Sequence, residues 1–389
     1  MTVRSRGQIL PLILFCLVIA GVLMVIMFNV TQKVTDKTVA SNASDAAVYS
    51  GGVWAARQLN YMAYTNRAMI ANHVAAGHLI AYVSWTEYIE KVADNINDIG
   101  QYIPYVQVVT RALDAYAGIV KTAAEVSAYV LIPGIDTVNG LYAASQLQAK
   151  FDLNPTRVEA IMSEVVEVHD PVLRFNNTSD LGGSTGSSYQ PQIDLAIAQY
   201  RAKLVAATEI ASPGSDDNEM SDMVELSYAG SEEWLNNREW TWTLAPGIKL
   251  RKSASTEQEL NGGLGNWEAE DELELGTWSG KWNWNTIGEG DASSDDADPA
   301  YAGIRSYARK SSGPDEELYI DLVALSTKFD NETVARTVMD IDSKGTVISG
   351  YSKARVYFEM PETGFLKNTP QYSNLYNPFW KAKLVAPWP

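Results

Sequence analysis

The sequence predicts an α+β fold, in which an N-terminal transmembrane helix continues into an Ala-rich helical stalk and a β-rich, Trp-rich distal region follows. Three observations support this prediction. The run from Ile9 to Phe28 contains no charged side chain. No proline occurs between Pro11 and Pro104, and alanine occupies twelve positions from Ala40 to Ala81. Nine of the eleven tryptophans lie at or beyond Trp234, where the composition changes.

Composition limits the classes of protein that this chain can belong to. Its 389 residues include 30 basic and 47 acidic side chains, for a net charge of −17. A chain without a basic surplus does not fit a nucleic-acid-binding protein, because it cannot displace counterions from phosphates. The single cysteine, Cys16, excludes an intramolecular disulfide or a multi-cysteine metal site.

The apolar run Ile9 to Phe28 is long enough to form a membrane anchor. As a helix its twenty residues span roughly 30 Å, the thickness of a hydrocarbon core. A cleaved signal peptide is the alternative, but MFNVTQKV after the run offers no small-x-small cleavage site. We therefore expect an uncleaved single span, with the short head of Arg4 and Arg6 in the cytoplasm and the acidic body outside.

Helix-forming sequence continues beyond the anchor, with Gly51-Gly52 as a weak point and an end at Gly100 and Pro104. A second helix is predicted from Val106 to Leu131, stopping at Pro133-Gly134. A third begins at Asn154-Pro155, an N-cap followed by proline at the first helical position. The Gly/Ser/Asn-rich stretch 176–188 predicts a loop, and a further helix is expected from Pro191 to Ile210.

Small residues on the predicted stalk recur at spacings of four, three, four and four, which places them on one face. Small side chains let two backbones approach closely. The alternative is that alanine is frequent here only because it favours helix. We predict that this stripe packs against another helix, either of a partner or of the same chain: Ala40, Ser44, Ala47, Gly51 and Ala55.

Five segments beyond Trp234 read as strands, from their alternation or their β-branched and aromatic residues. They are REWTWTL, GTWSGKWNWNTI, LYIDLVAL, GTVISGYSKARVYFEM and FWKAKLVA. The stretch from Glu268 to Asp298 holds ten acids and one lysine, which is typical of a solvated loop. The predicted regions are 1–30 (basic head and anchor), 31–175 (helical), 176–230 (linker and helix) and 231–389 (β-rich and acidic).

Motifs of catalytic or metal sites fit poorly. The tract GDASSDDADP has Asp296 where a calcium loop needs glycine and Ala302 where it needs glutamate, so a solvated acidic turn is favoured and we expect no dependence on calcium. No HExxH or P-loop motif occurs, and the serine segment Gly276–Gly280 reads GxxSG and not the GxSxG elbow. We therefore expect no enzyme and no cofactor. The tryptophans Trp240, Trp242, Trp278, Trp282 and Trp284 alternate and could stack sugars, although strands that bury tryptophan are commoner.

The opening RGQILPLILF, followed by SNASDAAVYSGGVWAARQLNYMAYTNRAMIANHVAAGHLIAYVSW, resembles the TadE/TadG-like proteins of tight-adherence (Flp) pilus assembly. Those begin with an RG-plus-apolar anchor and a helix with an A-D-A-A-like element, here Ser44 to Ala47. The ending ARVYFEMP…SNLYNPFWKAKLV is similar to the carboxyl end of cysteine-poor members.

The resemblance implies a single-pass inner-membrane protein with a periplasmic or extracellular body that works in pilus or secretion-type assembly. Its partners would be other assembly proteins, met through the N-terminal helix, in a homo- or hetero-oligomer. Two departures matter. The adhesion-site motif of some TadG proteins is missing, and Leu12 replaces the glutamate that prepilin-peptidase substrates carry five residues after glycine, so we expect no cleavage after Gly7. The function that follows is a minor-pilin-like structural component; the alternative is a surface-exposed module that binds carbohydrate or protein.

Overall fold

The fold is known from a computed structural model, and the parts of the chain that it describes are 9–100, 106–183, 189–212, 219–229, 238–258, 265–311, 317–330, 346–361 and 372–387. The predicted basic head with Arg4 and Arg6 lies outside the described residues, as do Gly7, Pro104 and Trp234.

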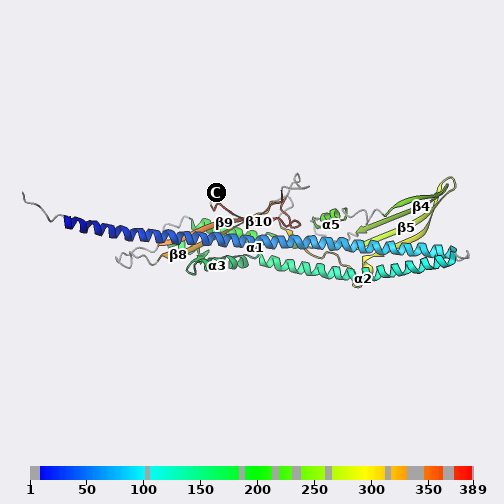
Figure 1. Cartoon of the computed structure of the whole chain (residues 1–389), viewed down its shortest axis with the longest axis horizontal. Coiled ribbons are helices and arrows are strands. Elements are labelled where there is room, and N and C mark those ends of the chain that lie inside the picture. Colours follow the sequence, from blue (N-terminus) through cyan, green and yellow to red (C-terminus); the bar gives the residue numbers. More distant parts are fainter. Residues whose placement is uncertain are drawn as a thin grey trace, which may run out of the picture.

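One helix, α1 (Ile9–Gly100), runs along most of the molecule (Figure 1). Its 92 residues give a length of about 138 Å. Side chains from Ile9 to Val39 are exposed or half-buried, whereas part of every turn from Ala40 to Thr86 is buried. Helix and strand elements pack along that second part, which confirms the predicted α+β class. Gly51 and Gly52 do not interrupt the helix.

The second helix, α2 (Val106–Asp152), runs antiparallel to α1. Hydrogen bonds join Thr110 to Asn97 and Asn72 to Asn139, each at 3.0 Å. The predicted stop at Pro133-Gly134 is wrong, because α2 continues through it. Proline removes one backbone hydrogen bond, but the side chains around it, such as the fully buried Ile132, are held against α1 by packing.

Three shorter helices follow: α3 (Pro155–His169), α4 (Gln190–Val205) and α5 (Glu219–Ala229). The predicted start of α3 is confirmed, since the Asn154 side chain accepts a hydrogen bond from Thr156 N at 3.0 Å. The helix predicted to reach Ile210 ends at Val205 instead. Residues Thr208–Ala211 form strand β2, which pairs with β7 (Tyr307–Lys310), a long-range partner that local sequence does not reveal. Short 3-10 helices cover Thr178–Gly183 and Ser294–Asp296.

A four-stranded antiparallel sheet, here called the proximal sheet, packs on the part of α1 nearest the exposed apolar end. Its order is β1 (Arg174–Phe175), β8 (Ile320–Asp330), β9 (Thr346–Phe358) and β10 (Trp380–Val385). Its core is shared with α1, α3 and α4. The predicted β-rich region is therefore split, and its C-terminal half returns to the first half of α1 (Figure 1).

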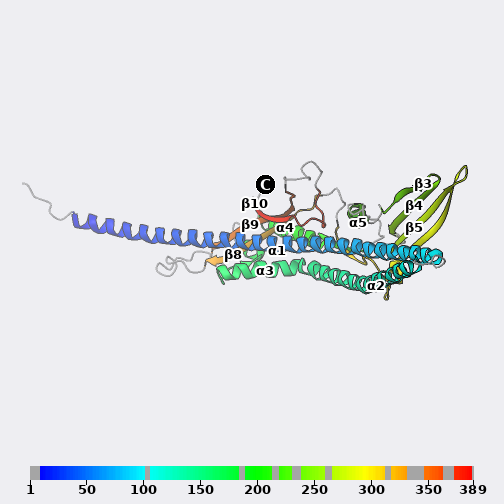
Figure 2. The ribbon, with the colours of Figure 1, turned by 45° about the vertical axis from the view of Figure 1, so that its right-hand side comes forward.

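The second sheet, here called the distal sheet, is an antiparallel meander of β3 (Trp240–Ala245), β4 (Ile248–Gln258), β5 (Trp267–Trp278) and β6 (Trp282–Ser293). It packs against the far end of α1 (Figure 2). The prediction of a solvated acidic loop from Glu268 to Asp298 is wrong over much of its length, because most of this stretch forms strands β5 and β6. Glu268 and Glu270 are exposed while Ala269 is buried between them, so these two glutamates lie on the exposed face of a strand whose other face is buried.

A buried polar cluster fastens the centre of the molecule. Gln146 of α2 donates to Asn66 Oδ1 at 2.7 Å and to Thr65 Oγ1 at 2.8 Å. Its carbonyl accepts from Ala308 N at 2.8 Å, and Asn66 donates to Ala308 O at 2.7 Å. Hydrogen bonds that satisfy buried polar groups fix one register, so α1, α2 and β7 are locked together.

Candidate functional site

The predicted small-residue stripe of α1 is buried along its whole length: Ala40, Ser44, Ala47, Gly51 and Ala55. Elements of the same chain cover it. Ser44 Oγ donates to Gly350 O at 2.9 Å in the proximal sheet, and a Cβ placed on Gly51 would lie 2.7 Å from Met162 Sδ of α3. The neighbouring Gly52 faces Ala382 of β10 in the same way, at 3.2 Å. Because these residues of α1 are small, the proximal sheet and α3 both approach the α1 backbone closely.

Substituting Ala47 with leucine is expected to lower the free energy of unfolding by about 1–3 kcal/mol, because the added carbons must enter a filled core. Tyr49→Leu is the control, since that side chain is 46% exposed, and its effect should be smaller. Thermal unfolding of the detergent-solubilised full chain measures both. Equal shifts for both variants, or none for either, would mean that the stripe reflects only composition.

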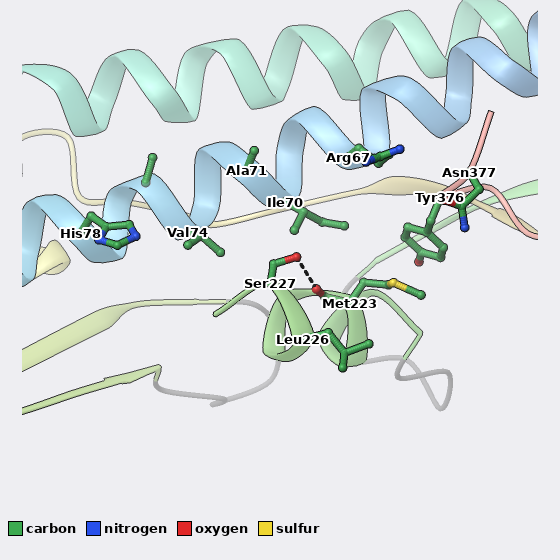
Figure 3. Close-up of a pocket in the computed structure, with 11 residues that line it drawn as sticks. Arg67, Ile70, Ala71, Val74, His78, Met223, Leu226, Ser227, Tyr376 and Asn377 are labelled. Atoms are coloured by element: carbon green, nitrogen blue, oxygen red, sulfur yellow. Dashed lines mark hydrogen bonds between the residues drawn. The ribbon is translucent and has the colours of Figure 1, made fainter. Parts of the chain in front are cut away.

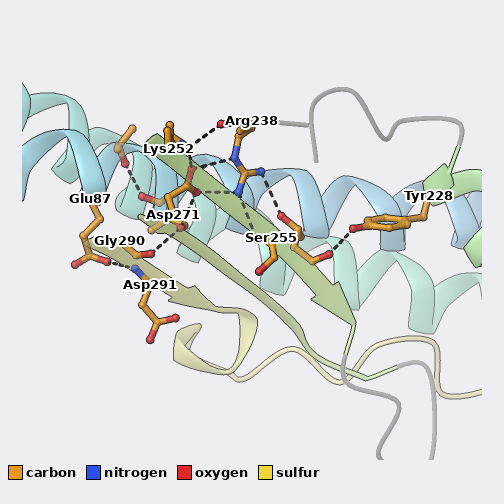
Figure 4. Close-up of polar contacts among 12 residues, drawn as sticks. Glu87, Tyr228, Arg238, Lys252, Ser255, Asp271, Gly290 and Asp291 are labelled. Carbon is orange, nitrogen blue, oxygen red and sulfur yellow. Dashed lines mark hydrogen bonds and ion pairs between the residues drawn. The ribbon is translucent and has the colours of Figure 1, made fainter. Parts of the chain in front are cut away.

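The distal sheet is held to α1 by a buried cluster of charges around Asp271 (Figure 4). The Asp271 carboxylate pairs with Arg238 at 2.8 Å and also with Lys252, and all three side chains are at most 5% exposed. Ser84 of α1 donates to the same carboxylate at 2.9 Å. Burial lowers the pKa of Lys252, and the Asp271 charge opposes that shift. The cluster therefore joins α1 to strands β4 and β5 and to the segment that precedes β3.

A buried histidine forms a second contact between α1 and the distal sheet. Gln258 donates to His73 Nε2 at 2.8 Å, so the ring proton on Nδ1 faces the Tyr301 hydroxyl, also at 2.8 Å. The ring lies 5.2 Å from that of Trp267, which in turn packs on Gly77. Burial lowers the pKa of His73 to about 3, because the charged imidazolium would lose its hydration. The side chain is neutral in the folded protein at ordinary pH.

This histidine predicts an acid-sensitive stability. Between pH 6.5 and about pH 3 the unfolded chain binds a proton at His73 and the folded chain does not. Stability should therefore fall with decreasing pH in that window, by up to about 1.4 kcal/mol for each pH unit. His73→Gln should lose this part of the slope, and the exposed His169→Gln controls for removing a histidine. Urea unfolding across pH 7 to 4 tests it; parallel curves for wild type and His73→Gln would contradict it.

Aromatic and cationic side chains alternate at the turn end of the distal sheet, which splays away from α1 in Figure 1. We call Trp278, Trp282, Trp284, Lys249 and Arg251 the tip patch. Cross-strand partners point to one side of a sheet, and the pairs Gly276–Trp284, Lys249–Gly276 and Trp278–Trp282 place the patch on one face.

Rings and cations stack on one another within the tip patch. Lys249 Nζ lies 4.6 Å from the centroid of Trp282, and Arg251 Cζ lies 4.4 Å from that of Trp284. Trp278 is 54% exposed, and on the opposite face Trp242 is 63% exposed. Such a surface offers flat apolar faces beside two cationic groups, of which Arg251 also pairs with Glu274. It suits stacking on sugar rings or on a partner's side chains.

A groove of about 690 Å³ lies between α1 and α5 (Figure 3). Its walls are mostly apolar, including Ile70 and Val74 of α1 and Met223 and Leu226 of α5. His78 also lines it, and partial burial lowers the pKa of that residue. The described groove residues include a single histidine and no acid, so they do not form an acid–base pair.

The tract tested for calcium ends β6 and forms the following 3-10 helix, Ser294–Asp296. Within the described ranges no three histidine, cysteine, aspartate or glutamate side chains are grouped as a metal site would need. Ser279, the serine of the GxxSG segment, accepts from Asn283 at 2.8 Å in the turn between β5 and β6. Independence from calcium and absence of catalysis stay predictions.

Together these features define an extended protein in which two sheets pack along one long helix, with a candidate membrane span at one end of that helix. The 18-residue apolar window near the start of α1 has a mean hydropathy of 3.1 and is 0% buried. Residues 7–58 match the model of the Flp pilus-assembly TadE/G-like family, which confirms the resemblance over that segment and relates the chain to Flp pilus assembly. No curated protein sequence and no solved structure matches the chain.

Proposed function

We propose that this protein is a membrane-anchored, minor-pilin-like structural component of a Flp/Tad-type pilus or a related secretion system. The proposal rests chiefly on α1, which joins the exposed apolar segment Ile9 to Phe28 without interruption to the packed body that begins at Ala40. A continuous helix transmits position and force from a membrane to a distant surface, because it has no hinge. The family match to residues 7–58 supports the same role.

In this proposal the anchor lies in a bacterial inner membrane with the head in the cytoplasm and the body in the periplasm or outside the cell. Other assembly proteins would meet the chain through the N-terminal helix. The exposed part of α1 between the span and Ala40 supports this, since Val30 and Val34 are 55% and 59% exposed. Exposed apolar side chains on such a segment are suited to helix–helix contacts.

Gene deletion followed by complementation tests the assembly role. Pili should be lost on deletion and restored by the full chain. A matched form, in which residues 1–30 are replaced by a cleavable signal peptide, should release the same body and fail to restore them. Unchanged piliation after deletion would refute the assembly role, and full rescue by the released body would refute the need for an anchor.

The tip patch supports a second candidate function, the binding of carbohydrate or of a protein surface. Tryptophan and arginine are enriched among the residues that contribute most to binding between proteins. Glycan-array binding by the full chain tests this. Trp278→Ala should weaken any binding, whereas Tyr64→Ala, which removes another exposed aromatic residue from α1, should not. Binding that both variants retain would place the interaction elsewhere.

A further inference from the structure

The outward side of α2 is an uncovered apolar surface. Nine large apolar side chains are exposed from Val109 to Leu141. The six most exposed of them trace this surface along the helix. Their exposed fractions lie between 59% and 68%, and their spacings of 7, 3, 7, 4 and 11 keep them on one side of the helix. They are Val109, Tyr116, Ile119, Val126, Val130 and Leu141. We call this surface the α2 outer face.

Packing against α1 uses a different side of α2. Ala117, Ala124, Ala128 and Ile132, all at most 2% exposed, form that side. Lys121 pairs with Glu87 and Glu90 of α1, at 3.0 and 2.8 Å. Helical spacing puts the charged residues of α2 between Val109 and Leu141 away from the outer face. The outer face is thus free of charge on a chain whose net charge is −17.

The size of the α2 outer face fits a protein interface. Nine such side chains present roughly 700 Å² of apolar area. The largest patch on a typical monomer is about 300–600 Å², and each partner in a standard interface buries about 800 Å². A groove of about 770 Å³ runs along one flank and gives room for side chains of a second helix. Small residues such as Ala115 and Gly118 line it, together with Glu90 of α1, whose charge is paired with Lys121.

Distance separates this face from the membrane of the anchor. Asn139 bonds to Asn72 of α1 and Thr110 to Asn97. Those α1 positions lie 44 and 69 residues beyond Phe28, or about 66 and 104 Å along the helix. α2 has a window with a mean hydropathy of 1.3, apolar enough for a candidate span. Its antiparallel packing on α1, however, holds it outside the bilayer that contains Ile9 to Phe28.

We propose that two copies of this chain pair through the α2 outer face, with the two α2 helices parallel about a twofold axis along the molecule. Anchors in one membrane hold both copies at the same height, so each residue of the face meets its own counterpart. The absence of charge from the face allows this contact between two bodies of the same negative charge. Small residues such as Ala112 and Ala123 let the helix backbones approach.

Disulfide crosslinking of the full chain in native membranes tests the pairing. In a Cys16→Ala background, Ala112→Cys places a thiol on the outer face, and Arg111→Cys places one on the adjacent exposed residue that points elsewhere. Oxidation should give at least about tenfold more covalent dimer for Ala112→Cys, since only identical positions on the face come within disulfide reach. An antiparallel pair would not join two copies of position 112, because this position is near one end of the face and the two copies would then lie at opposite ends of the contact.

A second pair of variants separates specific pairing from chance collision. Val130→Glu places a charge on the outer face, and Leu147→Glu places one on another exposed side of α2; the side chains replaced are 68% and 55% exposed, so both variants should fold. Val130→Glu should reduce the Ala112→Cys dimer at least about tenfold, and Leu147→Glu should leave it unchanged. Three results would overturn the proposal: equal crosslinking of positions 111 and 112, a dimer that survives Val130→Glu, or no dimer at all. The last result would favour a different protein as the occupant of the α2 outer face.

Discussion

Asp271→Ala is expected to lower the free energy of unfolding by about 3–5 kcal/mol, because removing one partner of a buried ion pair leaves an uncompensated charge. Here it leaves two, Arg238 and Lys252, whose side chains are 5% and 2% exposed. It also removes one of the two acceptors of the Ser84 hydroxyl of α1, the other being Gly290 O. The distal sheet should therefore detach from α1 before the rest of the molecule unfolds.

The neighbouring Glu270→Ala is the matched control, because that acid is exposed on the opposite face of the same strand. It should change stability by no more than about 0.5 kcal/mol. Tryptophan fluorescence during denaturant unfolding reports on the distal sheet, which includes Trp267, a tryptophan 1% exposed. Equal midpoints for the two variants would show that the charge cluster does not hold the sheet.

Gly350→Ala is expected to cost about 3 kcal/mol or more, at or above the upper end of overpacking. A Cβ on Gly350 would lie 2.6 Å from Ser41 N and closer still to the Ala40 carbonyl oxygen. Both atoms belong to the backbone of α1, so no rotamer change relieves the clash, and β9 must move away from the helix. Its neighbour Ser44, which donates to Gly350 O, would lose that contact.

Gly140→Ala controls for the substitution itself, because no atom of the described residues lies within 4 Å of a Cβ at that helical position. Alanine there should stabilise the protein by about 0.5–1 kcal/mol, since glycine is the poorer helix former. Thermal melting and limited proteolysis of the full chain compare the two. If Gly350→Ala melts with the wild type, β9 and α1 are not in the close contact described.

Several parts of the fold follow from short-range patterns in the sequence. The uncharged run from Ile9 to Phe28 gives the exposed start of α1, and Asn154-Pro155 gives the start of α3, where the predicted cap bond is present. Alternation, or enrichment in β-branched and aromatic residues, gives β3, β8, β9 and β10. These succeed because capping and burial periodicity are local properties.

Other features depend on partners far away in the chain. Local rules end a helix at Pro133-Gly134, yet burial of Ile132 against α1 carries α2 through it. The density of acids predicts a loop, whereas burial of Ala269 and Leu273 holds this segment in the core as strand β5. The alternation of small and apolar residues with Glu268 and Glu270 is the sequence pattern that indicates this strand.

The sequence by itself determined the apolar start of α1, the helix-forming stretch that follows, most of the strand-forming segments and the TadE/G-like start, because each depends on short-range patterns of residues. Only the tertiary structure decided where those strands go. It places the proximal sheet on the stripe from Ala40 to Ala55 and the distal sheet, with its buried Asp271, on the other end of the same helix. Pairings across some 300 residues, such as Ser44 with Gly350, depend on shape and buried polar partners that no local pattern records.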